Sequence, residues 1–141
     1  MILLNTMVYA SLAYLIATLV HSMSAWSSLL TIVGTLVGFV GAVYLPMSML
    51  PESVANVIKC LPVLHGTAMM REVCTKDAIA ETFAGLPEIA GDQYRKAMGI
   101  SVYWGDNQFT LQFQVLFLII CAIIATAIAA VISRRRNLRD R

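Results

Sequence analysis

Residues 111–132 read LQFQVLFLIICAIIATAIAAVI and are followed directly by SRRRNLRDR at 133–141. An apolar run of about 20 residues forms a helix long enough to cross the roughly 30 Å hydrocarbon core of a bilayer. Two further uncharged apolar runs, residues 2–20 and 26–45, have the same character. Three such runs in one chain predict an all-α membrane protein with three transmembrane helices.

Charge is distributed along the chain in blocks. Of all residues 59% are hydrophobic and 13% are charged, whereas an ordinary soluble domain is about 25% charged. No Asp, Glu, Lys or Arg occurs in residues 1–51 or 108–133, while residues 52–106 carry both signs. The formal net charge of +2 is therefore an average over an acidic middle and a basic tail. It does not indicate nucleic-acid binding.

The basic tail predicts the orientation in the membrane. Lys and Arg are enriched on the cytoplasmic side of membrane spans, and Arg134, Arg135 and Arg136 follow the third span directly. We therefore expect a cytoplasmic tail, residues 133–141, whose arginines anchor the topology at anionic lipid headgroups. Counting back through the spans, residues 46–110 lie outside, as does the N-terminus.

Prolines divide the outside segment into short helices. Pro46, Pro51 and Pro62 each lack a backbone donor and disfavour helix in the residue before them. Residues 52–61 show apolar side chains at helical spacing, and residues 63–73 form a second predicted apolar helix. Both are too short to span a bilayer, so we expect re-entrant or interfacial helices at the outer surface, between the second and third spans.

The rest of the outside segment is polar. Residues 76–107 contain several glycines, which punctuate short elements. We expect two short surface helices here, residues 78–84 and 92–98, each followed by a glycine that ends it. This stretch is predicted to be a small outer cap without a core of its own.

The second span carries a glycine pattern. Gly34 and Gly38 form a GxxxG motif, and Gly41 follows about one turn later. Small residues on one helix face allow close backbone contact between helices in lipid. We therefore expect this face to pack against another span or a second protomer. Together with Tyr44, these glycines are the candidate residues for helix packing and the substrate path.

Residue patterns for covalent chemistry are not evident in the sequence. It has no GxxxxGK[ST] phosphate loop, no CxxC pair and no recognisable Ser/His/Asp constellation. His21 and His65 are predicted on opposite sides of the membrane, where they do not share a metal. Cys60 and Cys74 both lie in the outside segment, with free thiols favoured and a disulfide as the alternative. We therefore expect neither an enzyme nor a cofactor or metal site.

The order of motifs resembles the C-terminal half of ABC-2 type transporter permeases, the membrane subunits of bacterial ABC exporters. In that family the fifth span is entered through a Ser-rich turn and left through a Y-x-P-x-x-x-L-P element. Short outer helices and a P-x-x-H/Y element follow, then a sixth span and a basic cytoplasmic end. The residues that match these elements are Tyr44, Pro46, Leu50, Pro51, Pro62 and His65.

The resemblance implies a permease component in a bacterial cell membrane that forms part of a substrate path. The elements containing Pro46, Pro51, Pro62 and His65 would form an extracellular gate. The implied partners are a separate ABC ATPase, which hydrolyses ATP, a second permease protomer, and membrane lipid, with no nucleic acid.

The resemblance covers only half of the family pattern. Family members have six spans, and their main ATPase contact lies between the second and third. We therefore expect this chain to be the C-terminal half of a permease whose N-terminal half is missing. The alternative is a small non-transporting membrane protein, either a truncated remnant or an immunity-type protein that acts by binding.

Overall fold

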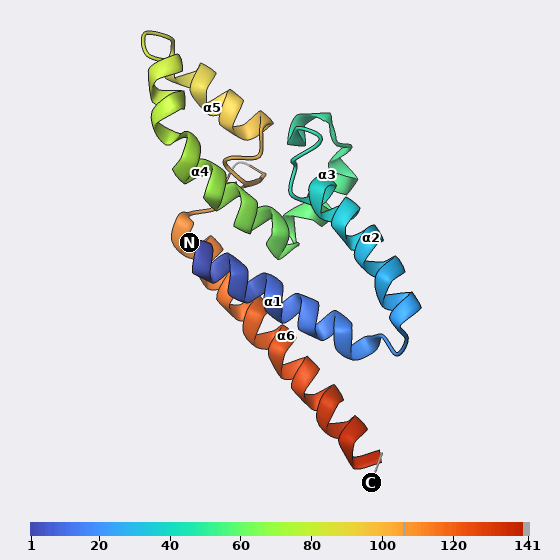
Figure 1. The fold of residues 1–141 in the computed structure, drawn as a ribbon. Helices are drawn as coiled ribbons and strands as arrows, with labels where there is room; N and C mark the ends of the chain where they lie inside the picture. The colour runs from blue at the N-terminus through green and yellow to red at the C-terminus, as the bar shows by residue number, and fades with distance from the viewer. Residues whose placement is uncertain (106, 140–141) are drawn as a thin grey trace.

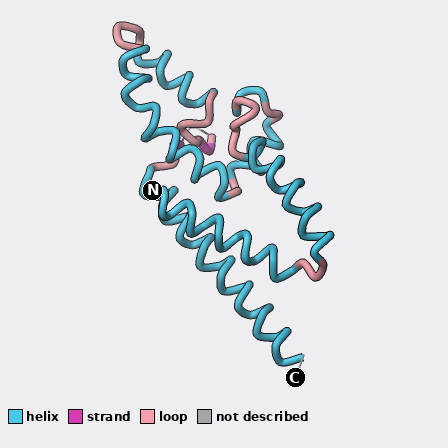
Figure 2. The backbone as a smooth tube through the Cα atoms, viewed as in Figure 1, coloured by secondary structure: helices cyan, strands magenta, loops and turns pink. Residues whose placement is uncertain are grey.

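The computed structural model describes residues 1–105 and 107–139, and this part of the chain is mostly helical (Figures 1 and 2). The three longest apolar helices are α1 (Ile2–Leu19), α2 (Met23–Val40) and α6 (Leu111–Arg139). Each is long and apolar enough to cross a membrane. The predicted all-α membrane protein with three candidate spans is therefore confirmed.

Six further elements lie between α2 and α6 in the described residues. They are η1 (Met47–Met49), α3 (Glu52–Lys59), α4 (Pro62–Thr82), α5 (Glu88–Ala97), β1 (Tyr103–Trp104) and β2 (Asn107–Gln108). The two strands pair as a short antiparallel hairpin that leads into α6. We call the elements from η1 to β2 the cap. Figure 1 shows the cap gathered at one end of the long helices, with the C-terminus at the other end.

Helix α4 is longer than the sequence predicts. The helices expected at 63–73 and 78–84 are joined into one continuous helix, and the helix expected at 92–98 begins earlier, at Glu88. The predicted break relied on a change from apolar to polar composition. Polar residues without Gly or Pro do not end a helix, and the Thr75 hydroxyl donates to the Arg71 carbonyl within it at 2.7 Å.

Helix α2 ends earlier than the predicted span of 26–45. Ala42 adopts a left-handed backbone conformation with a φ of 53°. The N–H groups of Val43 and Tyr44 both donate to the Gly38 carbonyl, at 2.9 and 3.3 Å. The chain therefore turns back on the end of α2, and it does so before the first proline is reached.

Two buried apolar clusters hold the structure together. One lies where α1, α4 and α6 meet and contains Val8, Met69, Leu118 and Ala122. The other lies between the cap and the turn after α2, and it contains Ala42, Ile58, Leu64, Ala68 and Val102. In the described residues α2 contributes only Gly38 to the buried set. The fold is thus an α1–α6 pair joined to the cap, with α2 beside it.

Candidate functional site

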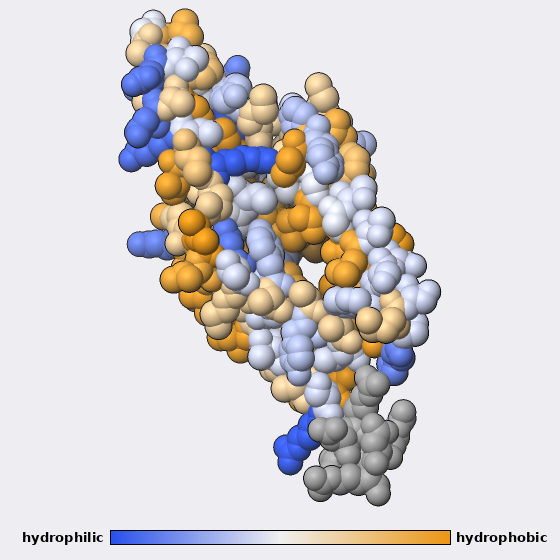
Figure 3. Space-filling model, in the orientation of Figure 1, coloured by the Kyte–Doolittle hydropathy of each residue, from blue (hydrophilic) through white to orange (hydrophobic). Residues whose placement is uncertain are grey.

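Helix α2 stands apart from the α1–α6 pair (Figure 1). It exposes a mildly polar stripe. Ser27, Thr31, Gly34, Thr35 and Gly38 fall within roughly 100° of its circumference, at about 100° per residue. All of them except Gly38 are exposed. Figure 3 shows pale, mildly polar residues along the right edge, where Figure 1 has α2. We call these five residues the α2 face.

The hydroxyl groups of the α2 face donate hydrogen bonds within their own helix. Ser27 donates to the Met23 carbonyl at 3.1 Å, Thr31 to the Ser27 carbonyl at 3.2 Å, and Thr35 to the Thr31 carbonyl at 3.0 Å. Each hydroxyl oxygen keeps lone pairs that can accept a further hydrogen bond. The face therefore tolerates an apolar environment and still offers acceptors to a polar molecule.

The predicted glycines have different surroundings. A Cβ added at Gly34 would meet no atom of the described residues within 4 Å, so they do not make the expected close contact there. Gly38 is covered by the ring of Tyr44. Gly41 approaches α4, where Thr67 donates to its carbonyl at 3.2 Å. Of the three glycines, Gly38 and Gly41 therefore serve packing within the chain, and Gly34 is open.

A cavity of about 380 Å³ lies between α1, α4 and the turn after α2. Its polar wall consists of Asn5, Thr6, Tyr9, Thr67 and Arg71. Its apolar wall consists of Ile2, Val43 and Met70, with Gly66 at the point where the two helices meet. We call it the α1–α4 cavity.

Asn5 is a deeply buried polar residue of the α1–α4 cavity, with 7% of its surface exposed. Its Nδ2 donates to the Gly66 carbonyl at 3.1 Å, while its Oδ1 has no partner among the described residues. A Cβ at Gly66 would lie 2.6 Å from that oxygen and 2.5 Å from the Tyr9 hydroxyl oxygen. The absence of a side chain at Gly66 therefore permits α4 to approach α1.

Arg71 connects three parts of the structure. Its Nη2 donates to the Ala42 carbonyl at 2.6 Å, and its Nη1 donates to the Met98 carbonyl at 3.1 Å. Burial lowers the pKa of the guanidinium from its usual value, although an Arg stays protonated in proteins. Arg71 therefore ties α4 to the turn after α2 and to the end of α5.

Neither Arg71 nor Asn5 was singled out from the sequence alone. The available signals were a single cation directly after Met69 and Met70, and a single amide within an uncharged run. Intramembrane and near-membrane polar groups are costly unless they have partners. Such isolated polar residues are candidates for contacts between helices.

The prolines proposed as gate elements all begin helical segments. Pro46 and Pro51 immediately precede η1 and α3, and Pro62 is the first residue of α4. Because proline has a fixed φ and no N–H, it is well suited to the first turn of a helix. These residues set the directions of the cap elements.

His65 is buried where the cap meets α6, with 1% of its surface exposed. Its Nε2 lies 2.8 Å from the Lys59 carbonyl oxygen. The centre of its ring lies 5.5 Å from the ring centre of Phe109 and 4.9 Å from that of Phe117. Desolvation lowers the pKa of His65, although the hydrogen bond to the carbonyl acts in the opposite direction. Since a carbonyl only accepts, Nε2 carries the proton, and Nδ1 lacks a partner among the described residues.

The remaining candidate residues lie apart from these sites. Arg134 and Arg135 are exposed near the end of α6, and the side chain of Arg136 lies outside the described residues. Cys60 and Cys74 are exposed free thiols. Within residues 1–105 and 107–139, no cluster of three His, Cys, Asp or Glu side chains is placed to hold a metal ion.

Comparison with known protein families gives a match over nearly the whole chain. A family model described as "ABC-2 family transporter protein" matches residues 1–131. The matched region contains α1, α2, the whole cap and most of α6. Comparison with curated proteins and with solved structures gives no match.

Proposed function

Since the chain belongs to the ABC-2 family of transporter proteins and is a permease component of an ABC-type transporter, we propose that its α2 face forms part of the substrate path. The path lies between two permease copies. The cap forms the extracellular gate of this path, and a separate ABC ATPase drives the cycle. The C-terminal end of α6 lies in the cytoplasm.

The exposed α2 face is the observation that supports this proposal most strongly. In lipid, helices associate through close packing of small residues and through hydrogen bonds of hydroxyl groups. The α2 face has both residue types, yet Thr31, Gly34 and Thr35 are exposed, and a Cβ at Gly34 would meet nothing. A second copy or a polar substrate would use these groups, whereas acyl chains would not.

Arg71 and His65 support a gate that moves with α2. Arg71 holds the turn that ends α2 and the end of α5 together, through the Ala42 and Met98 carbonyls. His65 joins the start of α4 to α6 through its aromatic contacts. A displacement of α2 would therefore be passed to the cap through the Arg71 contacts, while His65 keeps the cap attached to α6.

The positions of the arginines support the orientation. Arg134 and Arg135 are exposed near the end of α6 that lies far from the cap (Figure 1). If these residues lie in the cytoplasm, as the positive-inside rule expects, the cap lies outside. The α2 face then runs between the two membrane surfaces.

Thiol labelling of the α2 face tests the proposed function. Thr35→Cys is made in a chain whose three native cysteines are replaced by Ser, and the chain is reconstituted with a candidate ABC ATPase. We expect a membrane-impermeant maleimide to label position 35 at a rate that changes on adding ATP. Leu36→Cys is the matched control, because Leu36 is exposed but lies outside the α2 face.

Two outcomes would contradict the proposal. In the first, position 35 reacts with the maleimide no faster than position 36. In the second, the labelling rate of position 35 does not depend on ATP. Either result, together with failure of the ATPase to co-purify with the chain, would favour a small membrane protein that binds a partner without transport.

A further inference from the structure

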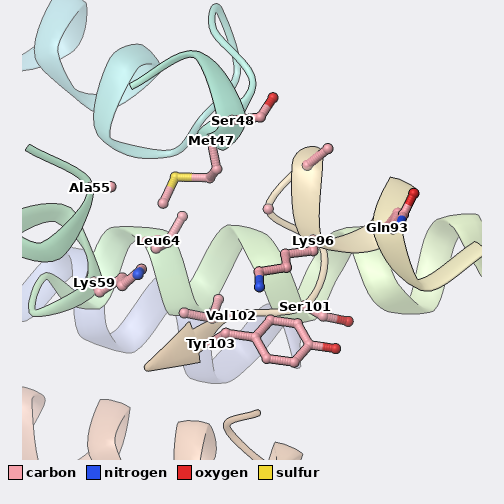
Figure 4. A pocket seen from close by; sticks show the side chains of 12 residues that line it. Met47, Ser48, Ala55, Lys59, Leu64, Gln93, Lys96, Ser101, Val102 and Tyr103 are labelled. Atoms are coloured by element: carbon pink, nitrogen blue, oxygen red, sulfur yellow. The ribbon is translucent and has the colours of Figure 1, made fainter. Parts of the chain in front are cut away.

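We propose that the cap binds an amphipathic anion, a molecule with a carboxylate or phosphate group next to an apolar portion. The site is a second cavity, of about 390 Å³, between η1, α3, α4 and α5 (Figure 4). It is separate from the α2 face and the α1–α4 cavity. The inference therefore goes beyond the proposed path and does not require transport.

The floor of this cavity is apolar. Met47 and Leu64 point into it from two different elements, and Val102 lies below them (Figure 4). Leu64 and Val102 belong to the buried cluster of the cap. A ligand that fills the cavity therefore contacts the packed interior of the cap and gains from burying an apolar portion there.

The charged groups of the cavity are both cations. Lys59 and Lys96 line it from α3 and α5, and none of its described lining residues is Asp or Glu. Figure 4 shows the Lys96 side chain reaching into the space above Tyr103, and its Nζ lies 5.2 Å from the centre of that ring. Two ammonium groups beside one apolar floor favour an anionic ligand.

The two ammonium groups have only neutral partners among the described residues. Lys59 Nζ donates to the Asn56 side-chain oxygen at 3.2 Å, and Lys96 contacts the Tyr103 ring. An ammonium group has three donors, so both lysines have donors available for a carboxylate or phosphate. Neutral polar groups of Ser48 and Gln93 also line the cavity.

The size of the cavity limits the ligand. Pockets for small molecules have volumes of about 300–1,000 Å³, and this one is near the lower limit at about 390 Å³. It fits a charged headgroup with a short apolar segment and is too small for a folded partner. The same chemistry is offered by an anionic membrane lipid and by a free amphipathic anion.

Calorimetric titration of the full chain tests the site. The chain in neutral detergent is titrated with decanoate and with decyl phosphate, and with decanol as the uncharged comparison. We expect saturable binding of both anions, weakened by added salt, and no comparable binding of decanol. The double variant Lys59→Gln/Lys96→Gln is expected to bind the anions at least tenfold more weakly.

Lys76→Gln is the matched control, because Lys76 is exposed on α4 and does not line the cavity. It is expected to keep the wild-type affinity. Equal helical content of the three proteins by circular dichroism shows that the substitutions leave the fold intact. Anion binding that survives the double substitution, or that is lost equally in the control, overturns the proposal.

Repeating the titration in bilayer nanodiscs distinguishes the two sources of ligand. In discs of phosphatidylcholine alone, decanoate is expected to bind as it does in detergent. If discs with added phosphatidylglycerol abolish decanoate binding, the site is occupied by lipid headgroups. If decanoate binds equally in both discs, the site takes a free anion. Absence of lysine-dependent binding in both discs and in detergent rejects the site.

Discussion

Gly66→Ala tests whether the close approach of α4 to α1 stabilises the fold. A Cβ at this position would lie 2.5 Å from the Tyr9 hydroxyl oxygen and 2.6 Å from Asn5 Oδ1. Both atoms are ends of side chains, so they can move. However, both side chains hydrogen-bond to α4, through the Gly66 and Val63 carbonyls at 3.1 and 3.4 Å.

The cost of that movement follows from the hydrogen bonds. Each bond contributes about 1 kcal/mol, and a buried donor without a partner costs about 1–3 kcal/mol. Replacing Gly by Ala within a helix recovers about 1 kcal/mol of helix propensity. We therefore expect Gly66→Ala to lower the free energy of unfolding by about 1–3 kcal/mol.

Unfolding in mixed micelles with increasing SDS, followed by circular dichroism, measures this change. Gly91→Ala is the control, because it is the same substitution within helix α5, and a Cβ at Gly91 would make only ordinary contacts with Phe83, at 3.9 and 4.0 Å. We expect the control to be as stable as the wild type or slightly more stable. If Gly66→Ala is no less stable than Gly91→Ala, the close packing of α4 on α1 at Gly66 does not stabilise the fold.

Three further predictions follow from the described contacts. Arg71→Ala removes two hydrogen bonds made by a charged group, and we expect it to destabilise the cap by about 2 kcal/mol. The rate of amide hydrogen exchange is expected to rise at Ala42 and to stay unchanged along α1. An unchanged exchange rate at Ala42 would contradict this prediction. Burial lowers the pKa of His65 below its ordinary 6.5, so the free energy of unfolding should be at its full value above pH 6.5 and should fall as the pH drops toward the pKa of the folded state. His65→Leu is expected to flatten this pH dependence. An equal slope in the variant and the wild type would refute the prediction. Replacing Arg134 and Arg135 by Glu should reduce the fraction of chains with a cytoplasmic C-terminus, measured with a C-terminal fluorescent protein that matures only in the cytoplasm; undiminished fluorescence would reject the topology anchor.

The spans could be predicted because hydropathy and length decide them. Residues 111–132 have no charge and no helix breaker, and they lie within α6. The cap was predicted less well. The two helices predicted at 63–73 and 78–84 are one helix, because no Gly or Pro lies between them and a change to polar residues does not by itself end a helix.

The candidate sites depended on contacts that the sequence does not display. Gly34 and Gly38 look equivalent in a GxxxG motif, yet Tyr44 covers only Gly38. That difference arises from the left-handed conformation of Ala42, which no residue pattern in the sequence indicates. Likewise, Asn5 and Gly66 are distant in sequence, and only the packing of α1 on α4 brings them together.

The proposal that the α2 face lies between two permease copies is tested most directly by disulfide cross-linking in membranes. Gly34→Cys is introduced into the chain without native cysteines, and Ile123→Cys, which is exposed on α6, is the comparison. Mild oxidation is expected to give a covalent dimer through position 34 and little dimer through position 123. If the Gly34→Cys protein stays monomeric, or if both variants give equal amounts of dimer, the proposal is contradicted.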